Sequence, residues 1–191
     1  MKTELLNYDL PAELIAQHPA RVRSQSRLLV LDSKAAKWTD SSFEQIGGWL
    51  RAGDCLVLND TKVIPARFFM RRNTGGRIEG LFLDEESGGK WIVMLKGAAR
   101  LKKNEELQLI ARDTSIYGQA RILDELGEGN WRIEVPIDPP AFEILEQIGM
   151  PPLPPYIKRG EKHKSHPLEE DIERYQTVYA REPGAAAAPT A

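Results

Sequence analysis

The amino-acid sequence predicts an α/β domain that is interrupted by a small antiparallel β-barrel. Over residues 1–65, short helical patterns alternate with fully apolar runs, which is typical of a sheet with both faces covered. Over residues 66–136, short β-forming runs are separated by turn residues, without a convincing helix. Residues 137–191 begin with a helical pattern, and we expect this part to return into the α/β domain.

The first part of the α/β domain has four expected elements. Residues 8–15 favour a short helix with Pro11 in its first turn, where a missing N–H costs little. Residues 28–31 form a compact apolar run that suits a buried strand. Residues 41–50 have a helical pattern closed by a glycine turn, and residues 55–58 predict a second buried strand.

The barrel prediction depends on strand-like runs and on the turns between them. About six strands at this spacing favour a closed or nearly closed antiparallel barrel, because closure removes unpaired sheet edges. The expected strands cover residues 66–70, 77–83, 91–96, 107–111, 117–123 and 131–135. A helix is then expected over residues 139–148, followed by a stiff extended connector over the proline-rich residues 150–156.

The composition is that of an ordinary soluble chain: 191 residues, 41% hydrophobic and 28% charged. No apolar run approaches the roughly 20 residues that span a bilayer, and residues 1–6 lack the apolar core of a signal peptide. We therefore expect a cytoplasmic protein. Phosphate-loop, dinucleotide-binding and nucleophile-elbow motifs are absent from the sequence.

The cysteine and histidines give little sign of a metal centre. Cys55 is the only cysteine, which excludes an internal disulfide and a cysteine-based zinc site, and its apolar neighbours predict a buried thiol. His18, His163 and His166 have no spacing that specifies a metal site. We expect no bound metal.

Charge is distributed unevenly along the middle of the chain. Residues 60–103 hold ten Lys and Arg against five Asp and Glu, and residues 104–149 hold three against ten. This asymmetry predicts either one basic face that meets phosphates or a solvated surface without a partner.

Two candidate ligand-binding segments have structural alternatives. Residues 59–67 follow an expected strand and deliver Lys62 and Arg67, although their first residues could only form a tight turn. Thr74, Gly75 and Gly76 would let a ligand approach the backbone closely, or would simply make a hairpin.

Two further candidate segments lie near the end of the sequence. Residues 155–159 hold an aromatic ring and two cations beside rigid prolines, which suits base stacking with phosphate contact or a linker packed on a neighbouring domain. Residues 171–191 carry hydroxyls, an amide and a guanidinium that could bind a polar ligand; the alternative is an exposed charged helix with a floppy tail.

Several of these segments together resemble one family, the S-adenosylmethionine:tRNA ribosyltransferase-isomerases of queuosine biosynthesis. The blocks that carry the resemblance run in order along the chain: residues 8–19 (YDLPAELIAQHP), 26–30 (SRLLV), 53–67 (GDCLVLNDTKVIPAR), 74–76 (TGG), 153–157 (LPPYI) and 174–184 (RYQTVYAREPG). The family fold is similar to the architecture expected above.

The resemblance implies an enzyme that donates the ribosyl group of S-adenosylmethionine, used as a co-substrate without a metal. The acceptor would be 7-aminomethyl-7-deazaguanine at the wobble position of tRNA, and the products epoxyqueuosine, adenine and methionine. We expect a monomer that orients two substrates and manages protons. The rival interpretation is an RNA-binding barrel module without chemistry.

The resemblance also suggests site residues, each matched to a position in these blocks or beside them. The expected catalytic residues are Asp60, Arg67 and Glu182. The expected substrate-binding residues are Lys62, Thr74, Gly75, Gly76, Tyr156, Lys158, Arg159, Arg174, Tyr175, Gln176, Thr177 and Tyr179. Because the chain covers roughly the N-terminal half of the family pattern, we expect an α/β domain that is incomplete at its C-terminus, with transferase activity weak or absent.

Overall fold

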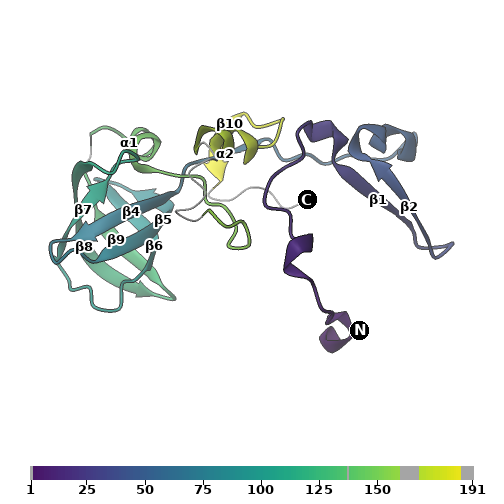
Figure 1. Cartoon of the computed structure of the whole chain (residues 1–191). Coiled ribbons are helices and arrows are strands. Elements are labelled where there is room, and N and C mark those ends of the chain that lie inside the picture. The colour runs from purple at the N-terminus through teal and green to yellow at the C-terminus, as the bar shows by residue number, and fades with distance from the viewer. Residues whose placement is uncertain (1, 137, 160–167, 186–191) are drawn as a thin grey trace. The chain divides into compact units, whose positions relative to one another are not determined.

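The computed structural model describes residues 2–136, 138–159 and 168–185, which fall into two compact units (Figure 1). Unit 1 comprises Met1–Leu58 with Pro155–Arg159, and unit 2 comprises Asn59–Pro154 with Gly160–Ala191. Within these described residues, no helix is long and apolar enough to cross a membrane.

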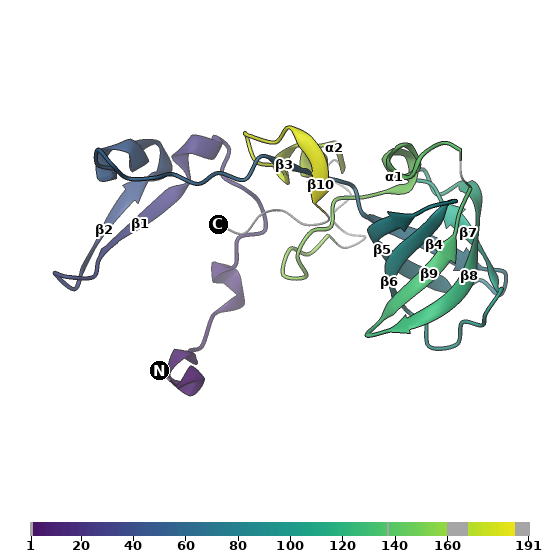
Figure 2. The same ribbon diagram turned by 180° about the vertical axis from the view of Figure 1, so that it is seen from behind.

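Unit 2 contains a closed barrel of six antiparallel strands (Figures 1 and 2). Around the barrel the strand order is β4-β5-β6-β9-β8-β7. The strands are β4 (Arg67–Arg72), β5 (Arg77–Glu86), β6 (Lys90–Lys96), β7 (Glu106–Ile110), β8 (Ile116–Gly127) and β9 (Asn130–Glu134). All six strands expected from the sequence are confirmed, and closure pairs every strand on two sides, which leaves no open sheet edge.

The barrel interior is filled by alternate residues of its strands. On β4, Phe68 and Met70 point inward and are fully buried, as period-two alternation requires. The Phe68 and Phe82 rings meet the buried Trp91 ring edge to face, with centroids 5.9 and 5.1 Å away. Gly80 faces this cluster, and a Cβ there would lie within 2.8 Å of three atoms of the Phe68 ring. The aromatic core therefore requires glycine at this position.

Helix α1 (Ala141–Ile148) extends the barrel core and confirms the helix expected there. Its buried side chains recur at helical spacing and join the same apolar cluster as the strands: Ala141, Ile144, Leu145 and Ile148. The helix ends at Gly149, where a Cβ would overlap the backbone carbonyl of Pro65. The next residue, Met150, exchanges two backbone hydrogen bonds with Arg67, of 2.7 and 3.2 Å, which ties the connector to the start of β4.

A second, smaller sheet in unit 2 joins two segments that are distant in sequence. Strands β3 (Thr61–Val63) and β10 (Glu182–Ala185) pair in parallel, and helix α2 (Leu168–Arg174) lies near them (Figure 2). The sequence predicted no strand in the β10 region.

Unit 1 contains an antiparallel hairpin of β1 (Arg27–Asp32) and β2 (Lys37–Ser42). Short 3-10 helices precede and follow the hairpin. These helices are η1 (Thr3–Leu6), η2 (Ala12–Leu14), η3 (Arg23–Gln25) and η4 (Phe43–Trp49). The helical pattern of residues 41–50 thus forms a 3-10 helix. The helix expected over residues 8–15 is wrong apart from the three residues of η2, because a short helix needs a packed apolar face and none of η2 is buried.

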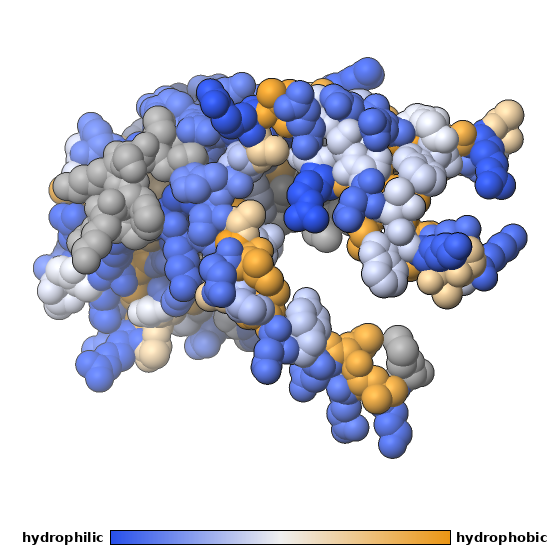
Figure 3. All heavy atoms as spheres, turned by 45° about the vertical axis from the view of Figure 1, so that its right-hand side comes forward, coloured by the Kyte–Doolittle hydropathy of each residue, from blue (hydrophilic) through white to orange (hydrophobic). Residues whose placement is uncertain are grey.

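The predictions of burial in this region are also wrong. Leu29 and Leu31 of β1 are 63% and 68% exposed, residues 55–58 form no strand, and the Cys55 thiol is exposed. Figure 3 shows hydrophobic side chains reaching the surface of the molecule. A strand is buried only when neighbours cover it, and in the described part of the chain β1 pairs with β2 alone. The α/β layer expected over residues 1–65 stays a prediction.

Candidate functional site

The β3–β10 pairing brings three of the expected site residues onto adjoining backbone. The Arg181 N–H donates to the Asp60 carbonyl over 2.6 Å, immediately before the two strands begin to pair. Glu182 then lies opposite Thr61, and Pro183 opposite Lys62. Two exposed carboxylates, of Asp60 and Glu182, and one exposed ammonium therefore share one end of this small sheet, although about 120 residues separate β3 from β10 in sequence.

Side chains from the segment between α2 and β10 fasten this arrangement. The Gln176 amide donates from Nε2 to the Val63 carbonyl (2.7 Å) and accepts at Oε1 from the Val63 N–H (2.8 Å), as a further strand would. The Thr177 hydroxyl donates to the Asn59 carbonyl over 3.0 Å. The Asn59 side chain in turn accepts from the Thr61 N–H, which makes the tight turn weighed from the sequence. Gln176 and Thr177 thus position the backbone that carries Asp60 and Lys62.

A small cavity lies beside α2. Asp171 is the one buried charged side chain in the described residues, at 8% exposed, and its carbonyl accepts from the Tyr175 N–H. Tyr175 and Gln176 line a cavity of about 20 Å³ together with Val63 and neighbouring prolines. That volume suits a single water molecule and not a nucleoside. Arg174 is half-buried, and Tyr179 is exposed.

Thr74, Gly75 and Gly76 form the exposed turn between β4 and β5. Gly75 has φ +89° and donates to the Arg72 carbonyl, and Gly76 accepts from the Arg72 N–H, both over 2.8 Å. The backbone therefore forms the simple hairpin turn that the sequence allowed as an alternative, and Gly75 and Gly76 are exposed to solvent. Arg67 lies on the outer face of β4, where its Nε donates to Glu79 over 2.7 Å.

Tyr156, Lys158 and Arg159 belong to unit 1, where Gln17 fixes their backbone. Gln17 donates from Nε2 to the Tyr156 carbonyl over 2.9 Å and accepts at Oε1 from the Lys158 N–H over 2.8 Å. The Arg159 guanidinium donates back to the Gln17 carbonyl over 3.0 Å. Gln17 lies in the block of residues 8–19 that carries the family resemblance. The sequence therefore drew attention to this segment, but it did not predict the hydrogen bonds from Gln17 to residues 156–159.

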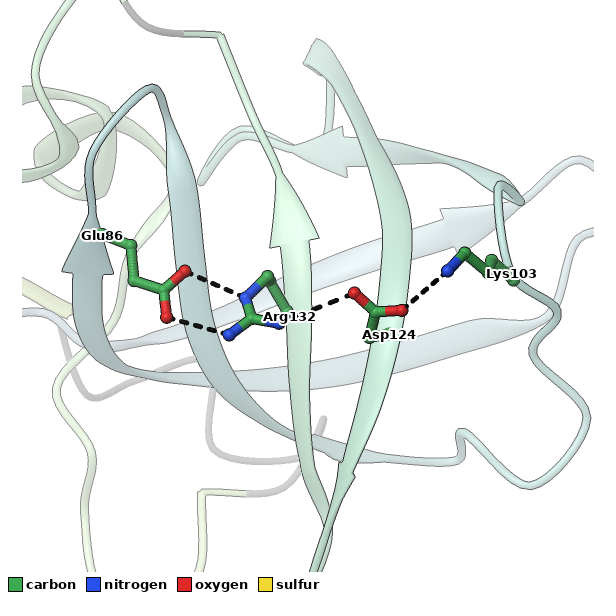
Figure 4. Close-up of polar contacts among 4 residues, drawn as sticks. All are labelled: Glu86, Lys103, Asp124 and Arg132. Atoms are coloured by element: carbon green, nitrogen blue, oxygen red, sulfur yellow. Dashed lines mark hydrogen bonds and ion pairs between the residues drawn. The ribbon is translucent and has the colours of Figure 1, made fainter.

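An ion-pair ladder across the barrel surface was not anticipated from the sequence (Figure 4). Arg132 of β9 donates to both oxygens of Glu86 (2.9 and 3.0 Å) and lies 3.5 Å from Asp124, which Lys103 contacts over 2.8 Å. The Arg132 hydrogen bond lowers the pKa of Glu86, and the Lys103 hydrogen bond lowers that of Asp124. Glu86 lies 46 residues from Arg132 and Lys103 lies 21 residues from Asp124, so no local pattern could reveal the whole ladder.

The described residues contain no group of three or more His, Cys, Asp or Glu side chains placed to hold a metal ion. His163 and His166 lie outside those residues.

Comparisons of the sequence with known proteins show one family. The family model described as "Queuosine biosynthesis protein" matches residues 3–191. The S-adenosylmethionine:tRNA ribosyltransferase-isomerase of Trichlorobacter lovleyi is 44% identical over 186 residues, which cover 97% of this chain and 51% of that protein. A crystal structure of S-adenosylmethionine tRNA ribosyltransferase from Thermotoga maritima matches 66% of this chain and 42% of its own, at 35% identity and a TM-score of 0.31. The chain thus spans about half the length of its curated relative.

Proposed function

The chain belongs to the queuosine biosynthesis protein family, and we propose that it carries part or all of an S-adenosylmethionine:tRNA ribosyltransferase-isomerase. The reaction transfers and isomerises the ribosyl group of S-adenosylmethionine onto 7-aminomethyl-7-deazaguanine at the tRNA wobble position. The products are epoxyqueuosine, adenine and methionine. The observation that carries this proposal is 44% identity, over nearly the whole chain, to a protein with that enzyme name.

The chemistry asks the protein for orientation and proton handling. The sulfonium of S-adenosylmethionine makes its ribosyl group electrophilic and acidifies the adjacent C–H. A general base is then needed near the donor, and a carboxylate in hydrogen-bond reach can supply it. Holding donor and acceptor together contributes further, because it makes the attack of the aminomethyl nitrogen effectively intramolecular.

The β3–β10 end offers residues of the right kind for the donor. S-adenosylmethionine carries positive charge on its sulfonium and amino group, which suits the exposed carboxylates of Asp60 and Glu182, whose backbones adjoin at this strand end. We infer that the exposed ammonium of Lys62, on the adjoining strand, meets the donor's carboxylate. The cavity beside Tyr175 is too small for this ligand, so we infer that the donor binds across the exposed strand end. Either carboxylate could serve as the base.

The acceptor side of the proposal uses three further candidates. Tyr156, Lys158 and Arg159 combine a half-exposed ring with two cations, which suits stacking and phosphate contact with an RNA loop. Gln17 holds their backbone in one conformation, which lowers the entropy lost on binding. The proposed partner is accordingly tRNA, bound by a cytoplasmic monomer.

The direct test is to incubate the purified chain with S-adenosylmethionine and tRNA that bears the deazaguanine precursor. Mass spectrometry should detect epoxyqueuosine in the tRNA, together with one free adenine for each product formed. Asp60→Asn and Glu182→Gln should each be compared with the unchanged chain, and the variant that loses turnover identifies the base. Absence of product from every form, including the unchanged chain, would refute the assignment of catalysis to this chain.

A binding module without chemistry is the second candidate, and the closed barrel favours it. The barrel with α1 holds almost all of the buried apolar residues, so it can fold as a stable core. Thermal melts distinguish the candidates, because a ligand at 100 times its dissociation constant stabilises the folded state by about 2.7 kcal/mol. Stabilisation by S-adenosylmethionine supports the enzyme, whereas tRNA binding without that stabilisation supports the module.

A further inference from the structure

The outer face of the β4–β5 hairpin presents a group of cations in regular positions. Because Phe68 and Met70 point inward, the alternate residues Arg67, Phe69 and Arg71 point outward. On β5 the outward positions include Arg77, opposite Arg71, and Glu79, opposite Phe69. Lys96 of β6 lies opposite Glu79 on its other side. We call the set Arg67, Phe69, Arg71, Arg77, Glu79 and Lys96 the basic face.

Within the basic face, two arginines oppose each other without a compensating carboxylate. Arg71 and Arg77 are direct cross-strand partners, an arrangement in which like charges destabilise the pair. Among the described residues, no carboxylate lies within ion-pair distance of either guanidinium. Glu79, the one carboxylate of the set, accepts from Arg67 over 2.7 Å. An anion bound from outside the chain could therefore compensate the repulsion between Arg71 and Arg77.

The far side of the barrel shows the opposite arrangement. Arg121 of β8 lies between Glu106 and Glu134, at 3.5 and 3.4 Å. Lys103 is likewise paired with Asp124. Arg121 and Lys103 are thus neutralised within the protein, whereas Arg71 and Arg77 have no ion pair among the described residues.

The Phe69 ring holds the arginines of the face in place. The Arg77 guanidinium carbon lies 3.8 Å from the ring centroid, and that of Arg67 lies 5.3 Å from it. A guanidinium stacked on a ring keeps its N–H groups at its edge, where they can bind a phosphate with two parallel hydrogen bonds. Because Arg77 is ordered before binding, less side-chain entropy is lost when it contacts a ligand.

The hairpin turn adds an open approach at the end of this face. Thr74, Gly75 and Gly76 connect β4 to β5 immediately beyond the Arg71–Arg77 pair. A Cβ added at Gly75 would meet no atom within 4 Å. The backbone at Gly75 is therefore open to the approach of a bulky polyanion.

We propose that the basic face binds the phosphate backbone of RNA, with Arg71 and Arg77 gripping phosphates and Phe69 positioning Arg77. The inference rests on the proposed function, since the RNA would be the tRNA substrate. RNA fits better than an acidic protein because the face combines guanidinium forks and a ring on a sheet surface, the elements of backbone recognition without base readout.

The test measures binding of a fluorescently labelled RNA stem-loop to the full chain by anisotropy, over a series of salt concentrations. Each phosphate contact contributes roughly 0.7 to 0.9 to the slope of log affinity against log salt. The Arg71→Gln/Arg77→Gln variant should therefore bind more weakly, with a slope reduced by roughly 1.5. Its melting temperature should stay within a few degrees of that of the unchanged chain, because the substitution removes both the Arg71–Arg77 repulsion and the contact of Arg77 with the Phe69 ring.

The matched control is Lys103→Gln/Arg121→Gln, which removes the same net charge from the far side of the barrel. It should leave the slope within roughly 0.5 of the original.

Equal losses of RNA affinity and of slope in the two double variants would refute the basic face as the RNA-binding surface. That result would leave RNA binding itself, and the proposed function, intact. No RNA binding by the unchanged chain at low salt would overturn the proposed tRNA substrate together with the face. Displacement of the RNA by polyglutamate at equal charge concentration would assign the face to acidic proteins.

Discussion

Replacing Gly80 by alanine should disrupt the barrel core. Gly80 lies on β5 opposite Phe68 of β4. A Cβ at this position would lie 2.7 and 2.8 Å from two edge carbons of the Phe68 ring and closer still to the carbon at its tip. The ring cannot move away, because Phe68 is fully buried and packs edge to face on Trp91. The added methyl group must therefore push apart the two strands that carry the basic face.

The expected cost follows from the packing of a dense core. Forcing an extra methyl group into a filled interior costs roughly 1–3 kcal/mol. For a domain the size of this barrel, each kcal/mol lowers the melting temperature by about 4–8 °C. We therefore expect Gly80→Ala to melt roughly 5–20 °C below the unchanged chain in circular dichroism.

Two further variants make the result specific. Gly118→Ala is the matched control, since a Cβ there would touch only Pro136, at an ordinary 4.0 Å, and it should melt within a few degrees of the unchanged chain. The second variant, Gly80→Ala/Phe68→Leu, removes the ring that the new methyl group meets. It should lose less stability than the two single substitutions added together. Unchanged melting of Gly80→Ala, or simple additivity in the double variant, would refute this packing argument.

Three other predictions address individual hydrogen bonds, ion pairs and packing contacts of unit 2. Gln176→Met removes both side-chain hydrogen bonds to the Val63 backbone and should cost roughly 1–3 kcal/mol of local stability. The Val63 amide should then exchange its hydrogen faster, and an unchanged exchange rate would show that these two hydrogen bonds do not stabilise β3. Arg132→Gln should weaken the pH dependence of stability, measured by melting from about pH 6 to about pH 3. Arg132 lowers the pKa of Glu86 in the folded state below its ordinary 4.5. The Arg132–Glu86 pair therefore stabilises the folded state above pH 4.5, and this stabilisation is lost as the pH falls through the folded pKa. An identical dependence of melting temperature on pH in the variant would disprove that the pair contributes. Gly149→Ala should lower the urea midpoint more than Gly80→Ala does, because its Cβ meets a backbone carbonyl that cannot rotate away; an equal or smaller shift would count against that reasoning.

The barrel could be predicted from the sequence because its signals are local. Strand β4 has alternating buried and outward residues, and helix α1 buries residues at helical spacing, so each element carries its own pattern. The turn at Gly75 likewise follows from neighbouring residues that tolerate positive φ. The errors at residues 8–15 and 55–58 have one origin: a short apolar run predicts burial only if another segment covers it.

The candidate site could be predicted only in part. The blocks around Asp60 and Glu182 were singled out from residue types and from the family resemblance, and the catalytic and binding roles given to their residues remain predictions. The sequence contained no sign that Gln176 pairs with the Val63 backbone, or that β10 exists as a strand. Both features depend on contacts between segments more than 110 residues apart.

By itself, the sequence determined the strands of the barrel, the helix that extends its core, the family, and the residue types available for chemistry. Only the tertiary structure decided which of these residues meet. It placed Glu182 beside the strand that follows Asp60, and it left Arg71 facing Arg77 on the barrel surface. The physical reason is that side-chain periodicity is set by the backbone of one element, whereas pairing, burial and charge compensation are set by whichever distant element becomes its neighbour.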